Sequence, residues 1–174
     1  VVDEPIETKN DPSLPSLKID KCNIKLDNVS FRYLNTNDKA INNINLSING
    51  GTMTAFVGHS GAGKSTIINL FPRFYEPQEG GIYIDNQNIH KVKLESLRKN
   101  ISLVSQDVVL FDDTIRANIA YANSEASEKD ILEACDYAAA TEFINKLPKG
   151  FETTIGENGV RISGGQKQRI SIAR

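Results

Sequence analysis

The chain has 174 residues, of which 39% are hydrophobic and 24% are charged, as is typical of a soluble globular domain large enough to bury a core. Its net charge of −2 argues against a general nucleic-acid binder, although a local anion site built from backbone N–H groups stays possible. No apolar run approaches the roughly 18 residues that span a bilayer. The cysteines Cys22 and Cys135 lie far apart and are expected to be reduced, inert thiols of a cytosolic protein.

Residues 1–18 are polar, contain three prolines and show no periodicity, so they predict an extended linker outside the core. The alternation in "IKLDNVSFRY" (24–33) changes phase near Asn28, which predicts a strand with a bulge. "NINLSI" (43–48) predicts a second strand, and "NGG" (49–51) predicts a tight turn. "TMTAFVG" (52–58) then continues as an apolar strand. The first third of the chain is therefore expected to be antiparallel β-structure leading into one buried strand.

Strands and helices alternate after this point. "KSTIINLFPRF" (64–74) predicts a helix with Pro72 as a boundary or kink. "GGIYID" (80–85) predicts a strand, "LESLRKN" (94–100) a short helix and "ISLVSQ" (101–106) a short buried strand. Residues 114–147 are expected to be mainly helical, with Ser127 as an N-cap. This order predicts an α/β fold with an antiparallel annex first and a helical insertion late.

One motif carries most of the chemistry. "GHSGAGKST" (58–66) fits G-x-x-x-x-G-K-[ST] and stands between a predicted strand and a predicted helix. Its glycines allow backbone N–H groups to surround a phosphate, Lys64 supplies an ammonium group, and the Ser65 hydroxyl can bind Mg²⁺. The alternative, a glycine turn beside a surface lysine, fits this context poorly. The predicted nucleotide-binding positions are Gly58, His59, Ser60, Gly61, Ala62, Gly63, Lys64, Ser65 and Thr66.

A second anion site is predicted near the end of the sequence. Ser163 and Gln166 form an S-x-x-Q capping box, and Gly164 and Gly165 between them leave the first-turn N–H groups open. A merely well-capped helix would not need two glycines, each of which costs about 1 kcal/mol of helix stability. Lys167, Arg169 and Arg174 are expected to keep this helix start basic. Since one triphosphate occupies the first site, the second is expected to serve a neighbour's nucleotide.

Together "GHSGAGKST", the glutamine in "LVSQDVVLF" and "ISGGQKQR" resemble the nucleotide-binding domain of an ABC transporter. "RFYEP", "LFDDTIRANIAY" and "TTIGENGVRISGGQKQR" are closest to the exporter branch. The resemblance implies a P-loop NTPase (RecA-like) core and divides the chain into a linker (1–20) after a membrane domain and a partial ATP-binding domain (21–174). A helical subdomain is expected over about residues 107–163.

The resemblance also assigns roles to single residues. Tyr33 corresponds to the aromatic residue that stacks on adenine; a strand-end core tyrosine is the alternative. Gln106 corresponds to a catalytic, Mg²⁺-contacting glutamine, against the alternative of a glutamine without function at the end of a buried strand, and Lys64 to the catalytic lysine. Glu157 matches a segment that contacts the membrane domain. Ser163, Gly164, Gly165 and Gln166 match the signature that closes over the γ-phosphate of the opposite subunit. Ile162 in place of leucine and Asn86 in a turn are minor departures.

In this family an aspartate–glutamate pair and a switch histidine follow the signature. The sequence ends at Arg174 without them, so the fold is expected to be incomplete at its C-terminus and the chain alone to have negligible ATPase activity. The implied function is ATP-driven export, with ATP and Mg²⁺ as cofactors. The implied partners are a second nucleotide-binding domain, arranged head to tail, and a transmembrane domain, and no nucleic acid. The soluble domain would lie at the cytoplasmic face of a membrane, in bacteria the inner one. A soluble ABC-type ATPase of DNA repair or translation, and a fragment without a nucleotide site, are the alternatives.

Overall fold

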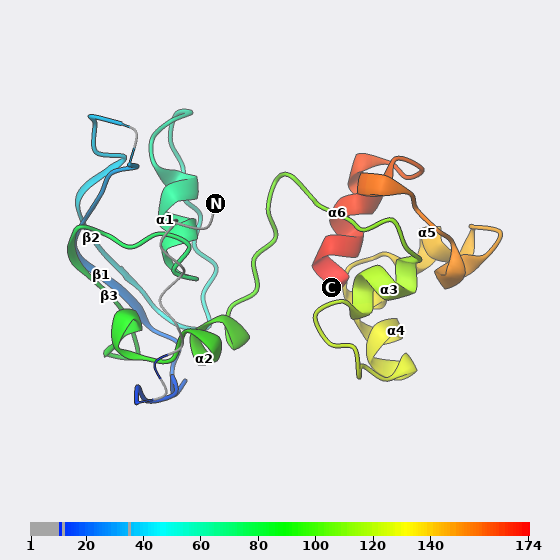
Figure 1. Cartoon of the computed structure of the whole chain (residues 1–174), viewed down its shortest axis with the longest axis horizontal. Helices are drawn as coiled ribbons and strands as arrows, with labels where there is room; N and C mark the ends of the chain where they lie inside the picture. Colours follow the sequence, from blue (N-terminus) through cyan, green and yellow to red (C-terminus); the bar gives the residue numbers. More distant parts are fainter. Residues whose placement is uncertain (1–10, 12, 35) are drawn as a thin grey trace. The chain divides into compact units, whose positions relative to one another are not determined.

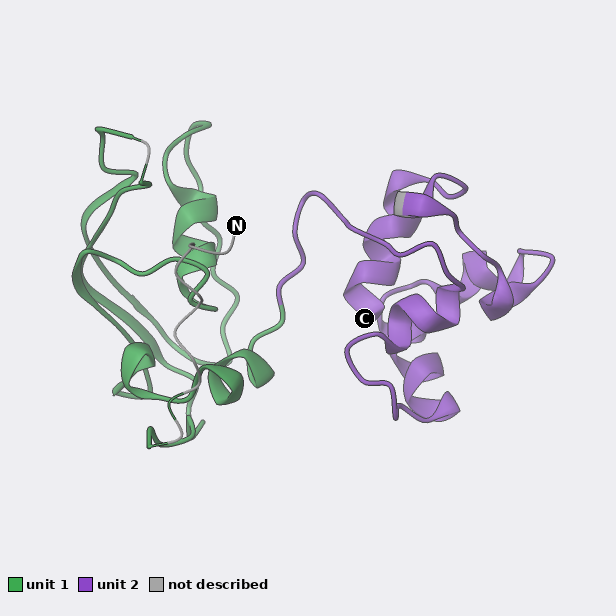
Figure 2. Cartoon of the chain, viewed as in Figure 1, with its two compact units in different colours: residues 1–102 green, residues 103–174 purple. Residues whose placement is uncertain are grey.

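The computed structural model describes residues 11, 13–34 and 36–174, so most of the predicted linker lies outside the described residues. The chain divides into two compact units, unit 1 (residues 1–102) and unit 2 (residues 103–174), which Figure 2 distinguishes by colour. Each unit has its own cluster of buried hydrophobic side chains. The two units are therefore described separately. None of the described residues belongs to a helix long and apolar enough to cross a membrane.

An antiparallel sheet forms the frame of unit 1. Its strands are β1 (Ile24–Phe31), β2 (Ile41–Ile48), β3 (Glu79–Ile84) and the two-residue β4 (Gln87–Asn88), in the order β2-β1-β3-β4 (Figure 1). The predicted bulge in β1 is present, because the register against β2 shifts between Leu26 and Val29 and Asn28 has a φ of 51°. The bulge places Leu26, Val29 and Phe31 in the core although they do not follow one simple alternation.

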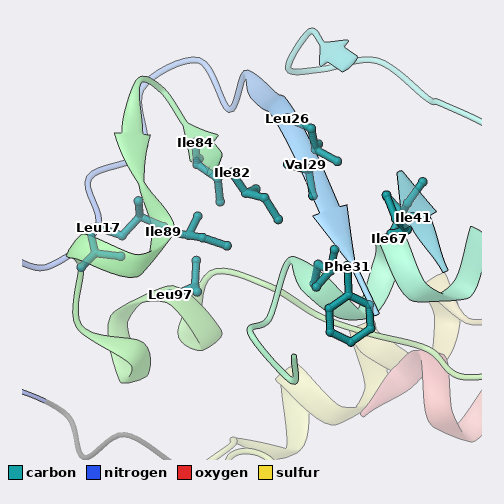
Figure 3. Close-up of a cluster of buried hydrophobic side chains, with 12 residues drawn as sticks. Leu17, Leu26, Val29, Phe31, Ile41, Ile67, Ile82, Ile84, Ile89 and Leu97 are labelled. Carbon is teal, nitrogen blue, oxygen red and sulfur yellow. The ribbon is translucent and has the colours of Figure 1, made fainter. Parts of the chain in front are cut away.

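Helices cover the apolar side of this sheet. α1 (Lys64–Leu70) begins as the sequence predicts but ends before the last residues of the predicted range 64–74, with Pro72 just beyond it as the boundary. A 3₁₀ turn η1 (Ile89–Lys91) leads to α2 (Leu94–Lys99). Ile67 and Leu70 of α1 and Leu97 of α2 are buried with the β1 and β3 side chains, as the close-up in Figure 3 shows for ten labelled residues. The core therefore holds α1, and with it the preceding loop, at a fixed place on the sheet.

The end of the predicted linker is part of this core. Leu17 is only 6% exposed and packs in the hydrophobic cluster of unit 1. The Leu17 N–H donates to Ser96 Oγ (2.9 Å), and the Pro15 carbonyl accepts from the Lys93 N–H (2.9 Å). The expectation that residues 1–18 stay outside the core is therefore wrong at Leu17, since a single leucine in a polar segment carries no periodic signal.

Asp85 links residues 20–23, which lie between Leu17 and β1, to the sheet. Its carboxylate accepts hydrogen bonds from the backbone N–H groups of residues 20–23, at 2.8 to 3.1 Å. These backbone hydrogen bonds hold the pKa of the Asp85 carboxyl below its usual range. The hydrogen bond from the Asp20 N–H lowers this pKa the most. Asp85 and Asn86 both have positive φ, in the turn between β3 and β4, as expected for Asn86.

Two strands expected from apolar sequence are not formed. Among the described residues, neither 52–58 nor 101–106 has strand structure. Phe56 and Ile101 are half-buried against the unit 1 core, but other apolar side chains of these segments are exposed: Met53 by 101%, Val57 by 89% and Val104 by 42%. A strand exists only when a neighbouring strand accepts and donates its hydrogen bonds. The described residues supply no such neighbour to either segment, so a strand-like sequence is left as extended chain.

Unit 2 is helical, as predicted for residues 114–147. Its elements are α3 (Ile115–Ala120), α4 (Glu128–Tyr137), α5 (Thr141–Asn145), two 3₁₀ turns, η2 (Gly150–Glu152) and η3 (Glu157–Gly159), and α6 (Gly164–Ala173). Ser127 caps α4 and forms a capping box with Asp130, which confirms the predicted N-cap. The helices enclose a core that includes Ile131, Ile144 and Ile170.

Candidate nucleotide-binding site

The glycine-rich loop 58–66 leads directly into α1, as the sequence predicts. Gly63 is the N-cap of α1 and has a left-handed backbone conformation (φ 84°). A Cβ atom at this position would lie 2.6 Å from the carbonyl oxygen of Ala40, closer than a real Cβ approaches another atom. Gly63 is therefore required both by its φ and by the close approach of the chain segment before β2. The loop is shaped by the sheet as well as by its own sequence.

Lys64 lies over this loop. Its Nζ donates hydrogen bonds to the carbonyl oxygens of Gly58 (2.9 Å) and His59 (2.6 Å). Residues Gly58 to Ala62 are exposed, and Ser65 is exposed one residue into the helix; within the loop the Ala62 N–H donates to the His59 carbonyl oxygen (3.3 Å). A phosphate entering the loop would meet this ammonium group and loop backbone N–H groups, which is the donor set that phosphate binding needs. His59 contributes its backbone carbonyl to Lys64, consistent with an ordinary loop residue.

An aromatic cluster stands beside the loop. The ring of Tyr33 makes edge-on contacts with Phe31 (centroids 4.9 Å apart, 83° between planes) and with Tyr75 (5.1 Å, 84°). The Tyr33 hydroxyl lies 3.0 Å from Thr66 Oγ1. A pocket of about 390 Å³ opens here, lined by Phe31, Arg32, Tyr33, Leu34, Tyr75, Glu76 and Gln78. Tyr33 is half-buried at the edge of this pocket, so its ring is accessible to a flat ligand as well as packed in the cluster.

The second predicted anion site lies in unit 2, at the start of α6. Ser163 and Gln166 form the predicted capping box: the Gln166 N–H donates to Ser163 Oγ (3.3 Å) and the Ser163 N–H to Gln166 Oε1 (2.8 Å). A Cβ atom at Gly164 or Gly165 would meet nothing within 4 Å. The glycines are thus not required by packing within the described chain, and they leave the first turn of α6 open.

Fewer basic side chains lie near this helix start than the sequence predicts. Arg174 lies at the opposite end of α6, where its guanidinium donates to the Asn118 backbone oxygen (2.8 Å), Asn118 Oδ1 (2.8 Å) and the Val109 oxygen (3.0 Å). Arg169 stacks over the ring of Phe143, with 5.3 Å from its Cζ to the ring centroid. The ten residues of α6 separate Ser163 from Arg174, so these two residues lie at opposite ends of the helix. The sequence shows that Arg169 and Arg174 are both basic, but it does not show where they lie relative to Ser163.

Gln106 and Glu157 also belong to unit 2. Gln106 is exposed in the segment after Leu103, and it does not end a strand because residues 101–106 have no strand structure. Glu157 begins η3 and is exposed. The structure thus brings together Tyr33, Lys64 and Thr66 within unit 1, and Ser163 with Gln166 within unit 2. The metal-binding role of Gln106 stays a prediction.

Two residues of unit 1 were missed by the sequence reasoning. Tyr75 supplies a second wall of the aromatic pocket, and the side-chain amide of Gln78 makes two hydrogen bonds to the backbone of Arg32, next to Tyr33. Tyr75 lies in the "RFYEP" segment, which had been noted only as a family likeness. No local pattern connects positions 33, 75 and 78, because their proximity arises from the pairing of β1 with β3.

A glycine loop that opens a helix, with a lysine over it and an aromatic pocket at its side, defines a P-loop nucleotide-binding protein. A model of the ABC transporter family matches residues 41–174. The chain belongs to the ABC transporter family. Membership of this family, whose relatives are named for an ATP-binding part, implies that the chain binds ATP.

The chain is similar to ABC transporters, two of which are named as exporters. It is 46% identical, over all of its 174 residues, to a putative multidrug export ATP-binding/permease protein of Staphylococcus aureus, of which it covers 30%. It is 52% identical over 153 residues (87% of the chain and 11% of the relative) to ABC transporter B family member 2 of Dictyostelium discoideum. A solved bacterial Atm1-family ABC exporter with ATP bound matches 99% of the chain and 30% of its own, with a TM-score of 0.93 and 43% identity. The chain thus spans about a third or less of these relatives.

The likeness confirms the predicted fold class, a P-loop NTPase with an antiparallel N-terminal sheet, and the exporter-type ATP-binding domain. The Staphylococcus aureus relative and the solved structure are named as exporters, which favours a transporter over a soluble ATPase of DNA repair or translation.

Proposed function

We propose that this chain binds Mg-ATP through residues 58–66 as the ATP-binding part of an exporter, and that ATP binding and hydrolysis drive outward transport. The observation that carries the proposal is the geometry of the loop. Position 63 requires glycine because of its positive φ and because a Cβ atom would clash with the Ala40 carbonyl oxygen. The Lys64 ammonium group already lies over the loop. Such a loop fits a triphosphate in both shape and charge.

The residues of unit 1 have distinct roles in this proposal. The Lys64 ammonium exchanges one or both of its carbonyl contacts for phosphate oxygens, a stronger, charge-assisted interaction. Ser65, exposed in the first turn of α1, supplies a hydroxyl to Mg²⁺, which usually takes few protein ligands and completes its shell with phosphate oxygens and water. Tyr33 stacks on the adenine at the edge of the 390 Å³ pocket.

Unit 2 supplies the interaction with a second copy. The open first turn of α6, with Gly164 and Gly165, is proposed to cover the γ-phosphate held by the loop of a partner domain, giving a head-to-tail pair with two nucleotides. Gln106 is proposed to contact Mg²⁺, and Glu157 to contact a transmembrane domain. The chain would then work at the cytoplasmic face of a membrane, without nucleic acid as a partner.

Titration of the 174-residue chain with a fluorescent ATP analogue tests the central claim. Lys64→Ala removes a charge-assisted phosphate contact of about 1.5–3 kcal/mol, so affinity should fall roughly ten- to a hundredfold. Lys39→Ala is the matched control, since Lys39 is in the same unit and pairs with Glu79 at the surface. Equal affinity of the Lys64→Ala variant and the parent would refute binding through this loop.

A further inference from the structure

The side-chain amide of Gln78 pairs with both main-chain groups of Arg32. The Arg32 N–H donates to Gln78 Oε1 (2.8 Å), and Gln78 Nε2 donates to the Arg32 carbonyl oxygen (3.0 Å). The backbone N–H of Gln78 also donates to the Ser30 carbonyl (3.0 Å). Beyond the end of β1 at Phe31, a glutamine side chain therefore takes the place of a neighbouring strand.

The residue held in this way directly precedes Tyr33. The Tyr33 ring contacts Phe31 and Tyr75, and its hydroxyl contacts Thr66. Tyr75 and Gln78 come from one short segment, so that segment contacts the Tyr33 ring and fixes the backbone before it. The next residue, Leu34, is fully exposed, and just after it the Thr36 N–H and Oγ1 both donate to the Tyr33 carbonyl oxygen (3.1 Å each).

We propose that Gln78 is a positioning residue for recognition of the nucleotide base; the proposal rests on the proposed ATP-binding function. Two hydrogen bonds to one residue restrict the φ and ψ of Arg32, and these angles set the direction of the Tyr33 side chain. A stacking surface fixed before the ligand arrives loses less conformational entropy on binding. The effect should concern the base alone, because the phosphates are bound by residues 58–66.

Gln87 provides a matched control within the same sheet. Its side-chain amide makes the same kind of pair with Lys18: the Lys18 N–H donates to Gln87 Oε1 (3.0 Å) and Gln87 Nε2 to the Lys18 oxygen (2.5 Å). Gln87 lies in β4 and is absent from the residues that line the aromatic pocket. The Gln87→Ala variant therefore shows how much ligand affinity changes when a glutamine–backbone pair is lost away from the aromatic pocket.

The experiment compares ATP with inorganic tripolyphosphate, which has the phosphates without the base, by calorimetric titration of the whole chain. Gln78→Ala should weaken ATP binding roughly three- to tenfold, the effect of one or two net hydrogen bonds, and leave tripolyphosphate affinity unchanged. Gln78→Met, which keeps the side-chain length but not the amide, should behave like Gln78→Ala. Gln87→Ala should leave both affinities at the parental values.

A second measurement separates positioning from direct contact, since Gln78 also lines the pocket. In the nucleotide-free chain, NMR of Gln78→Ala should show faster exchange of the Arg32 amide hydrogen and shifted Tyr33 ring resonances. Weaker ATP binding with an unchanged Tyr33 spectrum would mean that Gln78 touches the base directly, and would overturn the proposal. Unchanged ATP affinity, or equal losses for both ligands, would also overturn it. Failure of the parent chain to bind either ligand would instead refute the ATP-binding function, and the positioning role with it.

Discussion

The Tyr33 hydroxyl and the Thr66 hydroxyl are hydrogen-bonded, 3.0 Å apart, and this bond joins the end of β1 to the first turn of α1. Thr66 is the last residue of the glycine-rich motif and is 7% exposed. The proposed base-stacking residue and the proposed phosphate loop are thus in direct contact. This hydrogen bond anchors the Tyr33 ring on α1.

Tyr33→Phe separates the two roles of this tyrosine. The ring remains for stacking, so ATP affinity should change less than about twofold. The buried Thr66 hydroxyl loses its partner, so the free energy of unfolding of unit 1 should fall by about 1 kcal/mol. Thermal unfolding measures this loss, and Tyr137→Phe, at a side chain that is 92% exposed, should show none. A large loss of ATP affinity with unchanged stability would instead assign the hydroxyl to ligand binding.

Two glycines of the loop predict different costs for the same substitution. Gly61 and Gly63 have nearly equal φ values of 81° and 84°, but a Cβ atom at Gly61 meets nothing within 4 Å, whereas at Gly63 it meets the Ala40 oxygen at 2.6 Å. Gly61→Ala should cost about 1–2 kcal/mol of stability from backbone strain alone. Gly63→Ala should cost about 3 kcal/mol or more. Denaturant unfolding of the two variants compares them; equal losses would show that the contact with Ala40 relaxes freely.

The two thiols should react at very different rates. Cys22 is exposed and Cys135 is buried, and burial raises the pKa of the Cys135 thiol to about 11. At pH 8 about one Cys135 side chain in a thousand would be ionised, and the thiolate is the reactive form. A disulfide reagent should therefore modify one thiol rapidly in the folded chain and the second only after unfolding. Cys22→Ser should abolish the rapid phase, and two equal rates would contradict the burial of Cys135.

Gly164→Asp tests the proposed pairing of two copies. An aspartate in the first turn of α6 suits the helix, so the fold should persist, but its charge and bulk should repel a partner's γ-phosphate. Sedimentation of the chain with Mg-ATP should detect a pair in the parent and in Gly164→Ala, since a Cβ there meets nothing within 4 Å, but only monomer in Gly164→Asp. A Gly164→Asp chain that pairs normally would leave the motif as a helix cap alone.

Local chemistry was predictable from the sequence wherever the determinants lie within a few residues. The phase change at Asn28 predicted the bulge, Ser127 was predicted as an N-cap, and Ser163 with Gln166 was predicted as a capping box. The strand predictions for the apolar runs 52–58 and 101–106 were wrong, because a strand forms only beside a neighbouring strand, and the sequence of the run itself does not show whether one is there. Position in space was equally hidden: Arg174 has the charge expected near the signature but lies at the far end of α6.

The parts of the candidate site that escaped prediction are those built by residues distant in sequence. Tyr33, Thr66 and Gln78 meet because β1 pairs with β3 and α1 packs on the same sheet. A glutamine side chain that replaces a strand has no signature of its own. The sequence and the family resemblance therefore pointed to residues 58–66 and to Tyr33, whereas the contacts of Tyr75 and Gln78 around Tyr33 were found only in the structure.

The four backbone N–H groups that meet at Asp85 also determine how unit 1 would carry a mechanical load. A pull on the chain before Pro15 would first meet the Lys93 and Ser96 hydrogen bonds, the buried Leu17 and then the Asp85 carboxylate. The hydrogen-bond partners among these anchors lie in the turn after β3 and at the start of α2. Tension from that side would thus be taken first by the β3–β4 edge of the sheet and by α2.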